Sequence, residues 1–167
     1  MSRNRTVLAS AIAAIGLGAT PVILAAAPAA ATAQGTAQVR PQAHPAAAAA
    51  TISLRKTGRG MLLVNSRGFT VYAFSKDAKR QNRCAAISGC TTIWPMVKSG
   101  GRPQAGKGVK RSLLGTIKVG SATQVTYAGH PLYGFAGDKQ PGEANGDGQS
   151  AFGGTWTALK GSGAPAK

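Results

Sequence analysis

One six-residue pattern, Tyr-x-Phe-x-x-Asp, occurs twice in this chain and constrains its fold more than any other feature. It reads YAFSKD at residues 72–77 and returns as YGFAGD at residues 133–138, sixty-one positions later. The same offset carries Gly68 onto Gly129. Spacing that is kept over so many positions indicates a duplicated unit, so we expect two copies of one supersecondary structure.

The residues around each copy of the motif predict strands and turns. An aliphatic or β-branched run precedes a turn with Gly, Asn, Ser or His, and the motif follows on a return strand. Residues two apart on a strand share a face, so Tyr72 and Phe74 should point the same way, as should their equivalents. Trp94 and Trp156, sixty-two positions apart, mark a later strand in each unit. We therefore expect about four strands per unit.

Two units should pack together, because one unit of about sixty residues would bury only a marginal core. All nine aromatic residues lie between Phe69 and Trp156. We predict an all-β fold with at most a short helical turn near the cysteines. It forms a single domain over residues 51–167, built from two pseudo-symmetric β-hairpin repeats at about 51–111 and 112–167. The residues expected to be largely buried are Tyr72, Phe74, Tyr133 and Phe135.

The N-terminal segment predicts export. Arg3 and Arg5 precede an apolar run that ends in the small-x-small pattern ATA, which is typical of a signal peptide over residues 1–33. The alternative, a retained membrane anchor, is disfavoured because Gly and Pro interrupt the run. Residues 34–50 are rich in Ala and Pro and predict a linker. We expect a protein that is secreted or held at the cell envelope, without a transmembrane anchor after cleavage.

The two cysteines of the chain, Cys84 and Cys90, predict a disulfide, because an exported protein meets an oxidising compartment. Its short ring should contribute about 2 kcal/mol or somewhat less. The alternative, a metal or redox pair, lacks the Cys-x-x-Cys spacing and a nearby histidine.

These features together resemble a known bacterial family. The two motif copies, the segment CAAISGCTTIWP at residues 84–95 and the segment VTYAGHPLY at residues 125–133 are similar to the secreted repeats of unknown function, predicted lipoproteins with a Tyr-x-(Phe/Trp/Tyr)-x-x-Asp motif. The resemblance covers about residues 58–160. It implies a fold and a location but no reaction. The chain departs from the lipoprotein pattern, because no cysteine that could carry a lipid precedes Cys84.

The two motif aspartates, Asp77 and Asp138, have two interpretations. Each carboxylate could accept backbone N–H groups in the turn that leaves its hairpin, while the aromatic residues pack. Alternatively, both carboxylates and both tyrosines could face one ligand. An equal role in two repeats favours the structural interpretation, because a catalytic pair usually needs different environments.

The second motif continues into an acidic loop with alternating oxygen ligands, which makes it a weak candidate for calcium. The position where an EF-hand supplies its bidentate acid is Gly154, and no helical pattern flanks the loop. We predict no other cofactor. The weak candidate ligands are Asp138, Glu143, Asn145 and Asp147.

Catalysis has little support in the sequence. His130 is the one histidine of the expected domain, and no nucleophile-elbow, zinc-protease, phosphate-loop or dinucleotide motif is present. No catalytic residue is predicted, and we lean towards a protein that is not an enzyme.

Charge is distributed unevenly between the repeats. Residues 51–118 hold fourteen Lys and Arg against one acid, whereas residues 119–167 hold three of each sign. High net charge alone can serve solubility, but a basic surface can also bind polyanions. The predicted basic surface comprises Arg55, Lys56, Arg59, Lys76, Lys79, Arg80, Arg83, Lys107, Lys110 and Arg111.

We therefore expect a non-enzymatic, envelope-associated protein whose basic half attaches to anionic cell-wall or surface polymers. Specific nucleic-acid binding is not expected, because the chain is exported and has no nucleic-acid-binding module. The alternative is an accessory protein for a small ligand, a metal or redox chemistry that uses the Tyr/Asp motifs and the acidic loop at residues 138–147. The sequence does not predict the oligomeric state.

Overall fold

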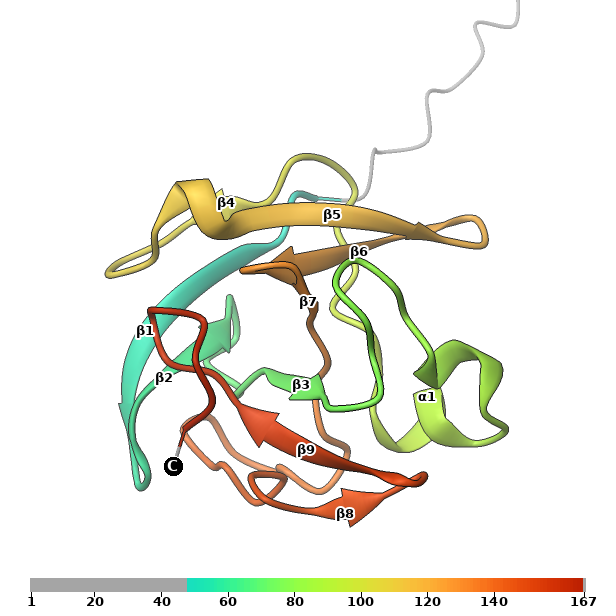
Figure 1. The fold of residues 1–167 in the computed structure, drawn as a ribbon. Helices are drawn as coiled ribbons and strands as arrows, with labels where there is room; N and C mark the ends of the chain where they lie inside the picture. Colours follow the sequence, from blue (N-terminus) through green and yellow to red (C-terminus); the bar gives the residue numbers. More distant parts are fainter. Residues whose placement is uncertain (1–47, 167) are drawn as a thin grey trace, which may run out of the picture. The chain divides into compact units, whose positions relative to one another are not determined.

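Each repeat begins with a long two-stranded hairpin (Figure 1). The structure, a computed structural model, describes residues 48–166. The predicted signal peptide and residues 34–47 of the predicted linker lie outside the described residues. The strands are β1 (Thr51–Thr57), β2 (Gly60–Asn65), β3 (Tyr72–Phe74), β4 (Gln104–Ala105), β5 (Leu114–Val119), β6 (Ala122–Tyr127), β7 (His130–Pro131), β8 (Ser150–Ala151) and β9 (Gly154–Ala158).

Helical structure in the described residues is limited to three short elements. They are the 3₁₀ turns η1 (Cys84–Ala86) and η2 (Arg111–Leu113) and the one-turn helix α1 (Cys90–Ile93). The predicted all-β class is confirmed. Helical turns do form at the cysteines, but η2 is a second location that the prediction did not include.

The strands form three small sheets with the orders β2-β1-β4, β3-β9-β8 and β5-β6-β7. The hairpins β1–β2 and β5–β6 are equivalent, since each has six paired positions and a glycine-containing turn. The sheet β3-β9-β8 differs from the other two, because it contains strands from both repeats. The motif strand β3 of the first repeat pairs with β9 of the second, so that Phe74 lies opposite Trp156. The two repeats therefore share a sheet.

The turn before each motif has the same backbone geometry in both repeats. Gly68 and Gly129 both have φ of 84°, a left-handed conformation that other residues adopt only with strain. Each turn also contacts the other repeat. The Arg80 N–H donates to the Gly129 carbonyl at 2.8 Å, and the Gly142 N–H donates to the Gly68 carbonyl at 3.0 Å.

One predicted strand is absent. Trp94 does not lie on a strand but follows α1, whose first residue is bonded in the Cys84–Cys90 disulfide. The next residue is Pro95, which has no N–H to donate to a strand partner. Trp156 does lie on a strand, β9. The two tryptophans thus both lie in the aromatic core, although one follows a helical turn and the other lies on a strand.

The core consists of two clusters of buried side chains. One is aromatic and contains Tyr72, Phe74, Trp94, Tyr133 and Trp156. The other is mainly aliphatic and is formed by the inner faces of the two long hairpins with the segments that follow them.

The expected burial is correct for Tyr72, Phe74 and Tyr133 but wrong for Phe135, which is only partly buried. The ring of Phe135 lies over Gly137, where a Cβ atom would approach the ring to 2.2 Å. The ring thus occupies the space that a side chain at position 137 would need, so a glycine is required there.

Residues 48–50, which precede the predicted domain, are paired with it. The Ala50 N–H donates to Ser99 Oγ at 2.9 Å, and the Ala48 and Ala50 carbonyls accept from Gly100 and Gln104. The last three residues of the predicted linker therefore pair with the chain around residues 99–104.

Candidate functional site

The two motif tyrosines meet at the centre of the domain. The Tyr72 N–H donates to the Tyr133 carbonyl at 2.8 Å, and the Tyr133 N–H donates to the Tyr72 carbonyl at 2.9 Å. Such a mutual pair is the hydrogen-bonded pair of an antiparallel ladder. It relates the two repeats by a local twofold axis that passes between the tyrosines.

The side chains of the motif follow the same symmetry. Tyr72 Oη donates to Asp138 Oδ2 at 2.6 Å, and Tyr133 Oη donates to Asp77 Oδ2 at 2.6 Å. Each tyrosine therefore binds the aspartate of the other repeat. Neither repeat completes its own motif.

The remaining carboxylate oxygens are also bonded to the protein. Asp77 Oδ1 accepts the Arg83 N–H at 2.7 Å, and Asp138 Oδ1 accepts the Asn145 N–H at 2.9 Å. These contacts are the turn contacts that the structural interpretation of the aspartates describes. The exchange with the opposite tyrosines is a feature that sequence reasoning missed. The identical Tyr-to-Asp spacing in both copies is the signal that could have suggested it.

Burial and the exchanged pairs determine the protonation of the motif. Burial raises the pKa of the Tyr72 and Tyr133 hydroxyls, and the hydrogen-bonded carboxylates raise it further. Both tyrosines thus remain protonated donors over the ordinary pH range. Burial also raises the pKa of Asp77, which the Tyr133 hydrogen bond and the N–H groups of Arg83 and Cys84 partly oppose.

Four aromatic rings stack through the middle of the domain, taken alternately from the two repeats. Ring centroids are 4.2 Å apart for Phe74 and Trp156, 4.0 Å for Trp156 and Trp94, and 4.3 Å for Trp94 and Phe135. The two tyrosine rings pack edge-on against this stack, Tyr72 on Trp94 and Tyr133 on Trp156. Together with the exchanged pairs, the stack ties the motif to the core.

The predicted disulfide is confirmed. Cys84 and Cys90 are bonded to each other, and both are fully buried. The ring they close places Trp94 one helical turn later against the aromatic core.

The acidic loop is ordered by its own side chains. Glu143 Oε2 accepts from the N–H groups of Lys139 and Gln140 and from Asn145 Nδ2. Asp147 Oδ1 accepts the Ala158 N–H at 2.9 Å. Within residues 48–166, no three acidic, His or Cys side chains lie close enough to hold a metal ion together. The weak calcium candidates Asp138, Glu143, Asn145 and Asp147 all take part in hydrogen bonds within the protein.

The acids and bases of the described chain are used very differently. All four acids, at positions 77, 138, 143 and 147, accept hydrogen bonds from backbone or tyrosine groups. In contrast, one ion pair is found over residues 48–166, between Arg59 and Asp147 at 3.7 Å. The many other Lys and Arg side chains of this part have no carboxylate within that range.

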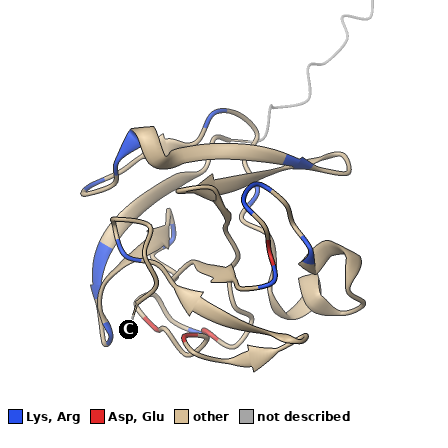
Figure 2. Ribbon diagram, in the orientation of Figure 1, with Lys and Arg blue, Asp and Glu red and all other residues tan. Residues whose placement is uncertain are grey.

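The predicted basic residues lie on three segments of the described chain. Figure 2 shows Lys and Arg on β1, on the segment between β4 and β5, and on the loop after β3. The first two regions are adjacent, because the Leu54 N–H donates to the Lys107 carbonyl at 2.8 Å. Arg80 lines one shallow hollow together with Ser112, the neighbour of Arg111. Lys76 and Arg83 line a different recess.

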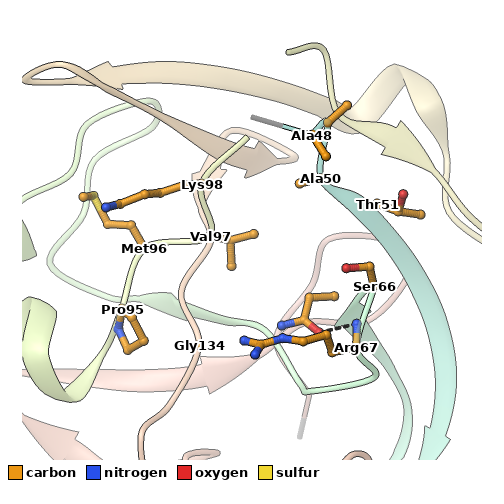
Figure 3. A pocket seen from close by; sticks show the side chains of 12 residues that line it. Ala48, Ala50, Thr51, Ser66, Arg67, Pro95, Met96, Val97, Lys98 and Gly134 are labelled. Carbon is orange, nitrogen blue, oxygen red and sulfur yellow. Dashed lines mark hydrogen bonds between the residues drawn. The ribbon is translucent and has the colours of Figure 1, made fainter. Parts of the chain in front are cut away.

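Two further cations, which sequence reasoning did not select, line a pocket of about 330 Å³ (Figure 3). Lys98 and Arg67 lie on opposite sides of Val97, and Thr51 and Ser66 lie towards β1. A neighbouring hollow of about 410 Å³ shares Thr51, Ser66 and Arg67 and adds Arg55. No acid lines either hollow. In the sequence Arg67 and Lys98 are separated from the basic clusters. Only the fold shows that they line the same pair of hollows as Arg55.

The fold and site define a class of protein: a duplicated β-domain, closed by exchanged tyrosine–aspartate pairs and a disulfide, with a strongly basic surface. The profile of the family described as secreted repeat of unknown function matches residues 53–98 and 118–160, which is more than half of the chain. The chain belongs to this family, and each matched segment contains one copy of the motif.

The family assignment agrees with the predicted location, secreted or at the cell envelope. No helix within the described residues is long and apolar enough to cross a membrane. Comparisons with curated proteins and with solved structures gave no match.

Proposed function

We propose that this secreted repeat protein attaches to anionic polymers of the cell wall or cell surface through its basic first repeat. The observation that carries the proposal is the unequal use of charge. Among the described residues 48–166, the acids are bonded within the fold, while the bases other than Arg59, which pairs with Asp147, have no carboxylate partner. Unpaired surface cations attract polyanions, and their counterions are released when a polyanion binds.

The double hollow that contains Lys98, Arg67 and Arg55 supports an extended contact. Its two parts share residues and so adjoin each other. Three cations around two adjoining hollows, together with the hydroxyls of Thr51 and Ser66, suit a polymer that carries several negative groups. Binding of this kind depends strongly on ionic strength, because mobile ions screen exposed charges.

Binding can be measured as retention of the mature protein on purified cell-wall material between low and high salt. We expect strong retention at low ionic strength and release as salt is raised. A matched pair of triple variants separates a basic surface from net charge, because each removes three positive charges. The variant in the basic half is R55Q/R67Q/K98Q, whose three cations line the double hollow, and the control is K139Q/K160Q/K167Q.

The first variant should weaken retention and flatten its salt dependence, and the control should change both less. Equal effects would mean that net charge alone is responsible. A metal or small ligand that raises the unfolding temperature independently of salt, without any retention on wall material, would instead favour the accessory-protein alternative.

A further inference from the structure

A recess on another part of the surface combines positive charge with apolar walls. It has a volume of about 630 Å³ and is lined by residues of the loop after β3, the disulfide ring and the turn between β8 and β9. Figure 1 shows where these three segments lie in the fold. This size is within the range of small-molecule sites. The lining residues that matter are Lys76, Arg83, Ala86, Ile87, Phe152 and Gly153.

One wall of the recess is held by the disulfide. Ala86 and Ile87 lie inside the ring closed by Cys84 and Cys90, and both cysteines are fully buried. The backbone of this wall is therefore fixed at both ends. Ile87 is only partly buried and packs on the aromatic core, so part of its side chain remains available to a ligand.

Another wall of the recess contains a residue with a left-handed backbone conformation. Phe152 has φ of 56°, in the left-handed region where glycine is the usual residue and an aromatic side chain is unusual. Its ring is partly exposed, packs on the aromatic core and lines the recess. Phe152 and Gly153 form the two-residue turn between β8 and β9, and a tight hairpin turn of this kind requires positive φ at both positions. The turn places the apolar ring of Phe152 beside the recess.

The rim of the recess is positively charged. Lys76 and Arg83 both line it, and no acidic residue does. The nearby Asp77 accepts the Tyr133 hydroxyl and the Arg83 N–H, so both of its oxygens are engaged. The two cations therefore face the recess without a carboxylate lining it.

We propose that this recess binds an amphiphilic anion, a small molecule with a carboxylate or phosphate head and an aliphatic or aromatic body. The head lies between Lys76 and Arg83, and the body lies on Ile87 and Phe152. An anion without a body would leave the apolar walls uncovered, and an uncharged body would leave both cations without a partner. The proposal does not depend on polymer attachment, since the recess shares no lining residue with the hollows around Arg67.

The test uses the folded mature protein and the fluorescent anion 1-anilinonaphthalene-8-sulfonate, with decanoate and decanol as competitors. We expect a saturable rise in fluorescence that decanoate reverses and decanol reverses at least about tenfold less well, because a charge-assisted contact is lost. Thermal unfolding in parallel confirms that the probe reports on folded protein.

The loop after β3 offers a matched control. The variant K76Q/R83Q removes two cations of the recess, and K79Q/R80Q removes two cations of the same loop that do not line it. We expect the first variant to weaken probe binding about tenfold and the second less than about twofold.

A third variant tests the apolar wall. Phe152→Gly removes the ring and suits the left-handed backbone, so the domain should remain folded. It should weaken binding about tenfold, through the loss of apolar contact. Equal losses from the two charge variants, competition by decanol as good as that by decanoate, or undiminished binding by the Phe152→Gly variant would each overturn the proposal.

Discussion

The exchanged tyrosine–aspartate pairs predict unequal effects for two chemically identical substitutions. Tyr72→Phe removes the donor to Asp138, whose side chain is buried, with only 6% of the residue exposed. Tyr133→Phe removes the donor to Asp77, which is only partly buried. Water can replace the missing hydroxyl at Asp77 far more easily than at Asp138.

The magnitudes follow from the fate of each carboxylate. A hydrogen bond to a charged group contributes about 1.5–3 kcal/mol, and a buried acceptor left without its donor adds its desolvation penalty. Tyr72 Oη also accepts the Gly146 N–H at 3.3 Å, a contact that phenylalanine cannot make. We expect Tyr72→Phe to lower the free energy of unfolding by about 3 kcal/mol. Tyr133→Phe should lower it by about 1 kcal/mol.

Guanidinium unfolding followed by tryptophan fluorescence can measure both changes. Its midpoint should fall in both variants while the slope of the free energy against denaturant stays constant, since the same surface is exposed on unfolding. The companion variant Asp138→Asn completes a double-mutant cycle with Tyr72→Phe. Equal losses from the two tyrosine variants, or a coupling near zero between Tyr72 and Asp138, would refute the reasoning.

Two further predictions concern the core and alkaline pH. Phe74→Ala, at a buried position, should lower the free energy of unfolding by about 4 kcal/mol, and Phe135→Ala, at a partly exposed one, by about 2 kcal/mol. The reverse order in denaturant unfolding would contradict the assigned burial. Because burial raises the pKa of Tyr72 and Tyr133, the folded state keeps protons that the unfolded state releases above about pH 10. Stability should therefore fall as pH rises there, by up to about 1.4 kcal/mol per pH unit for each tyrosine. In the Tyr133→Phe variant, the free energy of unfolding measured from pH 9.5 to 11 should fall less steeply with pH than in the original protein. An unchanged slope would contradict the raised pKa of Tyr133.

Much of the architecture could be predicted from the sequence because it is local. Alternating strands and glycine turns predict the two hairpins, and the position of Cys84 and Cys90 in an exported chain predicts their disulfide. Periodicity and turn chemistry act over a few residues, and they are visible in the printed order.

What could not be predicted depends on contacts between distant segments. The pairing of β3 with β9 and the exchange of Tyr72 and Tyr133 between repeats need the two units placed against each other. The meeting of Arg67, Lys98 and Arg55 around one double hollow has the same origin. Composition shows that the first repeat is basic. Which of its cations lie side by side depends on how distant segments pack, and the sequence alone does not show this.

The exchange of partners also limits how the two halves can change over evolutionary time. A substitution of one motif tyrosine is felt at a carboxylate encoded about sixty codons away, in the other half. Loss of a tyrosine from one copy therefore weakens both copies, because the carboxylate that is left without its donor belongs to the other copy. A chain with only a single copy could satisfy the same hydrogen bonds by pairing with a second molecule.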